Sequence, residues 1–187
     1  MFDLYFEIRK RICPFHEVAN QIPLKKKTLD IGCGSGILYK YFLNNKDYIS
    51  YTGIDKNIKK LQILQQESPS NVFFLDRKIE DILEDINNYD CILMIDVMHH
   101  INKKYQKMVI EKILINMNKG SVLIYKDISS KSFIKSLIKI RTVGPFELIS
   151  REPNRVFVCD SKTGFWIRRE IAPIMDALIS DGSKSFL

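Results

Sequence analysis

The chain has few of the residues that build cross-links and metal sites. It contains four cysteines and three histidines in 187 residues, and no two cysteines form a Cys-x-x-Cys pair. Their positions do not show the ligand spacing of a zinc site. We therefore expect no metal and no disulfide framework, which fits the reducing cytoplasm.

Long apolar runs are also absent. No stretch approaches the ~18 apolar residues of a membrane-spanning helix. Asp3 and Glu7 interrupt the apolar beginning of the chain, so we expect no signal peptide. The sequence has no internal repeat, low-complexity tract or linker. With 45% hydrophobic residues, residues 1–187 are predicted to form one domain with a substantial core.

Glycines, in contrast, gather in one place. Residues 28–36 read Thr-Leu-Asp-Ile-Gly-Cys-Gly-Ser-Gly, and a helical pattern starts at Ile37. Strand, glycine turn and helix is how an α/β fold presents its backbone to a nucleotide. A dinucleotide fingerprint would need a third glycine at position 37, and a phosphate-binding P-loop would need Gly-Lys-Ser/Thr. Neither pattern is met.

Alternating strands and helices follow this turn. Strands are predicted at residues 50–55, 71–76, 89–96 and 120–127, with a helix over 103–117 before the last of them. The run at 89–96 is continuous and apolar, as expected of a parallel strand buried on both faces. The fold class is therefore α/β, with a doubly wound, mostly parallel sheet.

The motifs resemble those of one enzyme family. Residues 28–36 are similar to motif I of the class I (Rossmann-like) S-adenosylmethionine-dependent methyltransferases. Residues 90–100, with Asp96-Val-Met-His-His at their end, resemble motif IV of the small-molecule members, and residues 117–124 resemble their turn and fifth strand. The resemblance covers residues 24–127, which it implies are the cofactor-binding core. Residues 1–22 look helical, and the resemblance implies that they form a lid.

The resemblance implies S-adenosyl-L-methionine as cofactor and S-adenosyl-L-homocysteine as product. Asp55 lies 21 residues after Gly34, near the offset at which an acid meets ribose hydroxyls. The same carboxylate could instead cap the following helix. Adenine is expected beside Lys78-Ile79-Glu80. The predicted cofactor-binding residues are Asp30, Gly32, Cys33, Gly34, Gly36, Asp55, Lys56, Ile79, Glu80 and Asp96.

Two adjacent histidines are the candidate general bases. A neutral imidazole at His99 or His100 could take a proton from a hydroxyl or an amine. Both residues could instead start a helix or pack against its end. The sequence leaves these readings open.

The net charge of +7 leaves the partner open. A basic surface favours anionic partners, but the lysines are spread along the chain. Residues 131–141 are predicted to form a basic amphipathic helix that covers the sheet or rests on an anionic membrane. We predict a cytoplasmic methyltransferase acting on oxygen or nitrogen of a small-molecule or lipid-like acceptor. The alternatives are an RNA methyltransferase and a cofactor-binding partner subunit without activity.

The C-terminal region, residues 128–187, departs from the family pattern. Class I methyltransferases usually end with an antiparallel pair of strands. Residues 155–159 predict one strand, whereas residues 166–179 favour a helix that Pro173 interrupts. We therefore expect an atypical or shortened end of the sheet.

Overall fold

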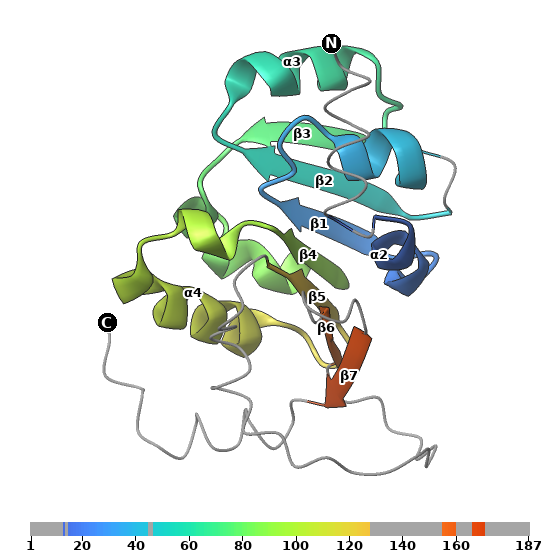
Figure 1. Ribbon diagram of the computed structural model, residues 1–187. Helices are drawn as coiled ribbons and strands as arrows, with labels where there is room; N and C mark the ends of the chain where they lie inside the picture. Colours follow the sequence, from blue (N-terminus) through green and yellow to red (C-terminus); the bar gives the residue numbers. More distant parts are fainter. Residues whose placement is uncertain (1–12, 14, 45–46, 128–154, 160–165, 171–187) are drawn as a thin grey trace.

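One seven-stranded sheet organises the chain (Figure 1). The computed structural model describes residues 13, 15–44, 47–127, 155–159 and 166–170. Its strand order is β3-β2-β1-β4-β5-β6-β7, with β7 antiparallel to β6 and all other neighbours parallel. The strands are β1 (Lys27–Ile31), β2 (Ser50–Asp55), β3 (Val72–Asp76), β4 (Cys91–Ile95), β5 (Val122–Lys126), β6 (Arg155–Cys159) and β7 (Trp166–Glu170). The predicted α/β fold with a mostly parallel sheet is confirmed.

Short helices connect the strands. Their bounds are α2 (Phe15–Gln21), the π-helix η1 (Tyr39–Leu43), α3 (Ile58–Gln66), the 3-10 helices η2 (Ile79–Asp81), η3 (Leu83–Asn88) and η4 (Met98–His100), and α4 (Lys103–Asn116). The predicted helix at 103–117 corresponds to α4. The helical pattern after the glycine turn forms only a short segment that ends in the π-helix η1.

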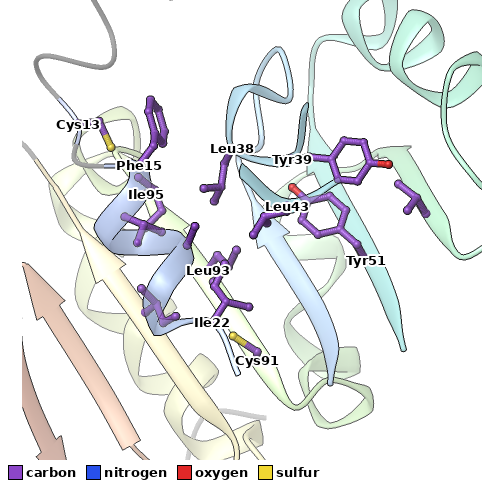
Figure 2. Close-up of a cluster of buried hydrophobic side chains, with 14 of the residues drawn as sticks. Cys13, Phe15, Ile22, Leu38, Tyr39, Leu43, Tyr51, Cys91, Leu93 and Ile95 are labelled. Atoms are coloured by element: carbon purple, nitrogen blue, oxygen red, sulfur yellow. The ribbon is translucent and has the colours of Figure 1, made fainter. Parts of the chain in front are cut away.

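The strands supply two hydrophobic cores, one on each face of the sheet. Within β4, Ile92 and Met94 join the core around α4, whereas Leu93 and Ile95 join the core around α2 and η1. Successive strand residues point to opposite faces, so a strand covered on both sides must be apolar throughout. Figure 2 shows the second core, in which α2 lies against the sheet and carries Phe15.

Aromatic rings fill the second core beside β2. The ring of Tyr51 lies 5.2 Å from that of Tyr39 and 5.8 Å from that of Phe74, measured between centroids. Figure 2 shows the Tyr39 and Tyr51 rings facing each other between η1 and β2. Tilted contacts of this kind contribute about 0.5–1.5 kcal/mol each beyond the burial of area. They fix η1, and with it the glycine turn, against the sheet.

The C-terminal expectation was wrong in part. The strand predicted at residues 155–159 is β6, but Trp166–Glu170 is strand β7 and not the start of a helix. Five residue pairs join β7 to β6 in antiparallel register, from Cys159 with Trp166 to Arg155 with Glu170. This non-local pairing overrides the local preference. The sheet therefore ends in an antiparallel pair and is not shortened.

Two predicted segments fall wholly or partly outside the described residues. The basic helix at 131–141 does so entirely, and the predicted N-terminal lid is described only at residue 13 and from α2 onward. Within the described ranges, no helix is both long and apolar enough to cross a bilayer.

The strand order places a crevice at one edge of the sheet. The order in which strands are added to the sheet reverses between β1 and β4. From β1 the chain adds β2 and β3 on one side, and it then returns to add β4 and β5 on the other side. In open parallel sheets, ligands bind beyond the carboxyl ends of the strands at this point. The glycine turn follows β1, and the motif with the two histidines follows β4.

Candidate functional site

A cavity of about 710 Å³ opens at this edge of the sheet. Residues that follow β1, β2, β3 and β4 line it, so it lies where the strand order predicts a ligand. Of the predicted site residues, the cavity brings together Asp30, Gly32, Cys33, Gly34, Asp55, Lys56, Ile79, Glu80, Asp96, His99 and His100. Gly36 is not among its lining residues.

Gly34 and Gly36 of the turn are required for different structural reasons. Both have positive φ, +59° at Gly34 and +67° at Gly36. A Cβ on Gly36 would lie 2.7 Å from Leu64 Cδ1, so this glycine allows the turn to pack on α3. A Cβ on Gly34 would meet no atom within 4 Å. Gly34 is also one of the residues that line the cavity, so a ligand can approach its backbone closely.

Hydrogen bonds within the protein occupy most of the turn's N–H groups. Those of Gly32 and Cys33 donate to Ile54 O, that of Gly36 to Cys33 O, and that of Gly34 to Asp55 Oδ2. The sequence predicts that this glycine turn presents its backbone to a nucleotide. In this conformation the N–H groups of Gly32, Cys33 and Gly34 hold the turn to β2, which leaves the Gly34 surface and nearby side chains to meet a ligand.

The Asp55 carboxylate connects the turn to the start of α3. Its Oδ2 accepts from Gly34 N at 3.0 Å, and its Oδ1 accepts from Asn57 N at 2.9 Å. Asn57 occupies the N-cap position of α3. A carboxylate has about four acceptor positions, so two backbone donors leave capacity for hydroxyl groups. The structural role and a ligand-binding role are therefore compatible at Asp55.

Asp30 is buried at the base of the cavity. It is 3% exposed, and its Oδ2 accepts from the Tyr51 hydroxyl at 2.5 Å. Burial raises the pKa of Asp30 from 3.8 to about 7, the Tyr51 hydrogen bond opposes this, and the nearby Asp55 charge adds to it. Burial also raises the pKa of the Cys33 thiol, with Asp30 and Asp55 contributing. This thiol is therefore held in its neutral form.

Asp96, directly after β4, has a conformation unusual for a residue with a side chain. Its φ is +56°. Both of its carboxylate oxygens accept from Lys126 Nζ, at 2.7 and 2.8 Å, and its N–H donates to Lys126 O. Both side chains are almost completely buried. Asp96 therefore faces the cavity as one half of an ion pair with the end of β5.

His99 is hydrogen-bonded to Asp127, the residue that follows Lys126. Its ring Nδ1 lies 3.1 Å from Asp127 Oδ1, and its backbone N–H donates to Asp127 Oδ2 at 3.1 Å. The His100 ring lies 4.0 Å from the His99 ring between centroids. Both histidines belong to η4, at the start of which Met98 is buried.

The far wall of the cavity follows β3. Ile79 and Glu80 lie in η2 and are joined in the lining by Arg77 and Lys78. The N–H of Lys78 donates to Asp81 Oδ2 at 3.1 Å, which fixes the start of η2. Lys56 completes this wall from the end of β2. The wall therefore carries three cationic side chains beside one carboxylate.

Sequence reasoning missed several lining residues. Phe15 comes from α2, Ile101 and Asn102 follow η4, and Tyr105 lies in α4 with 45% of its surface exposed. It also missed the partners Tyr51, Lys126 and Asp127. A charged Lys-Asp pair at the end of an apolar strand was a signal for the last two. Nothing in the spacing marks Tyr51 as the partner of Asp30.

No metal cluster emerges from the part of the chain that the structure describes. Within it, no group of three or more His, Cys, Asp or Glu side chains could hold an ion. Cys13 and Cys91 are buried, and Cys33 is partly exposed.

A protein-family comparison identifies the class. The model described as "Methyltransferase domain" matches residues 29–123, which is about half of the chain. The chain therefore belongs to the methyltransferase domain family, and the resemblance to class I S-adenosylmethionine-dependent methyltransferases seen in the sequence is confirmed. No curated protein matches the chain significantly.

Solved structures share the fold. A chain in the complex between the Haloferax volcanii Trm112 methyltransferase activator and the putative methyltransferase is 17% identical, with a TM-score of 0.50, over 64% of this chain and 55% of that one. A putative S-adenosylmethionine dependent methyltransferase from Listeria monocytogenes is 25% identical, with a TM-score of 0.48, over 57% and 50%. N-methyltransferase NodS from Bradyrhizobium japonicum is 17% identical, with a TM-score of 0.48, over 65% and 67%. The alignments span about half of the first two proteins.

Proposed function

We propose that the chain is an S-adenosylmethionine-dependent methyltransferase that acts on oxygen or nitrogen of a small-molecule or lipid-like acceptor. One observation carries the proposal. The glycine turn, Asp55, Asp96 and His99 come from the ends of three strands and line one cavity in a chain of the methyltransferase domain family.

The cavity residues fit this cofactor. The open backbone surface at Gly34 accommodates a flat or bulky group that a Cβ would displace. Asp55 would take the ribose hydroxyls with its remaining acceptor capacity. Ile79 and Glu80 would meet the adenine ring from the β3 side. Asp30, Cys33 and Asp96 would line the methionine end.

When bound, S-adenosylmethionine supplies an electrophilic methyl carbon on a sulfonium. The protein's contribution is to hold the acceptor atom in line with that carbon and to exclude water. Such positioning can account for much of the rate enhancement, because it converts a bimolecular step into an effectively unimolecular one. Ile101 and Tyr105 would contact the acceptor from the η4 and α4 side of the cavity.

An acceptor that carries a proton also needs a base. Among the acids of the cavity, Asp96 is paired with Lys126 and Asp30 accepts from Tyr51. The imidazoles of His99 and His100 line the same cavity, and an imidazole can take a proton near neutral pH. NodS and coclaurine N-methyltransferase bear names of nitrogen methylation, and an amine acceptor is one member of the class we propose.

Calorimetric titration with S-adenosylmethionine and S-adenosylhomocysteine tests the cofactor. We expect micromolar binding that Asp55→Ala weakens about 10- to 100-fold, since that change removes roughly 1–3 kcal/mol of charge-assisted hydrogen bonding. Glu67→Ala is the matched control, because Glu67 is an acid on the outer surface paired with Lys40. It should bind as the wild type does.

Four outcomes separate the hypotheses. Binding followed by transfer of a labelled methyl group to a small-molecule fraction of a cell extract supports the proposed acceptor class. Transfer to RNA in the same extract would favour a nucleic-acid substrate instead. Binding without transfer to any fraction would indicate a partner subunit. A folded protein that binds neither S-adenosylmethionine nor S-adenosylhomocysteine would contradict the proposal.

A further inference from the structure

A single buried carboxylate holds His99 at two points. Asp127 Oδ1 lies 3.1 Å from the ring Nδ1, and Oδ2 accepts from the His99 backbone N–H at 3.1 Å. The Asp127 side chain is 1% exposed, whereas that of His99 is 27% exposed. The carboxylate thus lies behind the imidazole, and the imidazole lies between the carboxylate and the cavity that it lines.

This geometry determines the tautomer of the ring. An ionised carboxylate can only accept hydrogen bonds, so Nδ1 of His99 must carry the hydrogen. In the neutral ring, Nε2 is then the nitrogen with a free lone pair. The backbone hydrogen bond to the same carboxylate fixes the distance between η4 and the end of β5, and so restricts how the ring turns.

Lys126, the last residue of β5, holds the beginning of the loop that connects β4 to η4. Lys126 binds Asp96 through both carboxylate oxygens. Two consecutive residues, Lys126 and Asp127, therefore set the positions of Asp96 and His99. The Asp96 carboxylate is thereby engaged by an ammonium group, whereas the His99 imidazole lines the cavity.

We propose that Asp127 is a positioning residue that presents Nε2 of His99 as the base, and that the acceptor is a hydroxyl or amine that carries a proton. This inference rests on the proposed function. The acceptor's O–H or N–H bond breaks as its oxygen or nitrogen binds the methyl carbon, and the methyl–sulfur bond breaks to leave a neutral thioether. The proton moves to Nε2, and the imidazolium formed faces the Asp127 carboxylate.

Nitrogen NMR of the histidine rings tests the positioning directly and needs no acceptor. The chain has three histidines, so labelling them gives three ring spectra, and His16 on α2 serves as internal reference. The spectra are recorded at about pH 9, well above the ordinary pKa of imidazole. We expect the Nδ1–H tautomer at His99 in the wild type, and a shift toward the Nε2–H tautomer in Asp127→Ala and, to a smaller extent, in Asp127→Asn.

His16 should give the same spectrum in all three proteins. An Nε2–H tautomer at His99 in the wild type would overturn the inference, even if neither variant folds. An unchanged tautomer in folded Asp127→Ala would overturn it as well. Titration with S-adenosylhomocysteine separates this failure from failure of the proposed function, because ligand binding tests the cavity and the tautomer tests Asp127.

Discussion

Lys126 Nζ lies within 2.8 Å of both carboxylate oxygens of Asp96, and the pair joins the ends of β4 and β5 inside the protein. Taking two charges out of water is costly, and their attraction only roughly offsets that cost. The pair therefore contributes little net stability as a unit. Its importance lies in the placement of Asp96 at the cavity.

The pair predicts a distinctive double-variant result. Lys126→Met leaves the Asp96 carboxylate buried without its ammonium partner, which should cost about 3–5 kcal/mol in the free energy of unfolding. Adding Asp96→Asn should recover most of that loss. Denaturant unfolding of the two single variants and the double variant measures the coupling. Independent, additive losses would show that the two side chains do not interact.

Gly34 and Gly36 predict opposite kinds of damage. Gly36→Ala should destabilise the protein by about 1–2 kcal/mol through its backbone angle, with roughly 1–3 kcal/mol more from overpacking against Leu64. In Gly34→Ala the new methyl group meets no neighbouring atom, so the loss of stability should come from the backbone angle alone. This variant should nevertheless weaken cofactor binding more than Gly36→Ala does. Thermal unfolding and calorimetric titration of both variants test this contrast. Equal loss of affinity in the two would contradict it.

The buried Asp30 predicts a pH dependence of stability. Its pKa is raised from 3.8 to about 7 on folding, so the folded state binds the proton more tightly than the unfolded state. The favourable contribution is complete below pH 3.8 and is lost as the pH rises through about 7. Above that range the cost of the buried charge is on the order of 4 kcal/mol.

Asp30→Asn removes this titration and can still accept from Tyr51. We expect the difference in unfolding free energy between Asp30→Asn and the wild type to grow in favour of the variant from about pH 4 to pH 7. Urea unfolding at several pH values gives that difference. A difference independent of pH would mean that Asp30 keeps its ordinary acidity.

The two histidines predict a separation of binding from turnover. A double His99→Ala and His100→Ala variant should bind S-adenosylhomocysteine within about twofold of the wild type. On the true acceptor, its turnover should fall roughly 10²- to 10⁴-fold, the usual contribution of a general base. Parallel titration and methyl-transfer assays measure both. Full turnover in the variant would exclude a catalytic role for either ring.

Much of the fold was accessible from the sequence because its strands are buried on both faces. The predicted strand at 50–55 agrees with β2 at both ends, and the prediction at 89–96 contains β4. Trp166–Glu170 was misassigned, since its two adjacent arginines break the alternation of a half-buried strand. Its conformation depends on pairing with β6, which a local pattern does not contain.

The candidate site was accessible to the extent that it lies at strand ends. Asp30, Asp55 and Asp96 each lie at the carboxyl end of a strand or just beyond it, so parallel topology alone brings them to one edge. Their partners were not accessible. Tyr51 reaches Asp30 from within β2, and Asp127 reaches His99 across 28 residues. Such contacts depend on side-chain directions in the folded state.

The left-handed backbone of Asp96 has a consequence for motion. The amide of Asp96 donates to Lys126 O and that of His99 to Asp127 Oδ2, so both amides are tied to the end of β5. A strained residue persists only where its surroundings hold it. Exchange of these two amides with deuterium should therefore be as slow as that of the central strands, because the loop opens only when the sheet does. The conformational entropy of this loop is lost during folding, and a ligand that arrives later finds it already ordered.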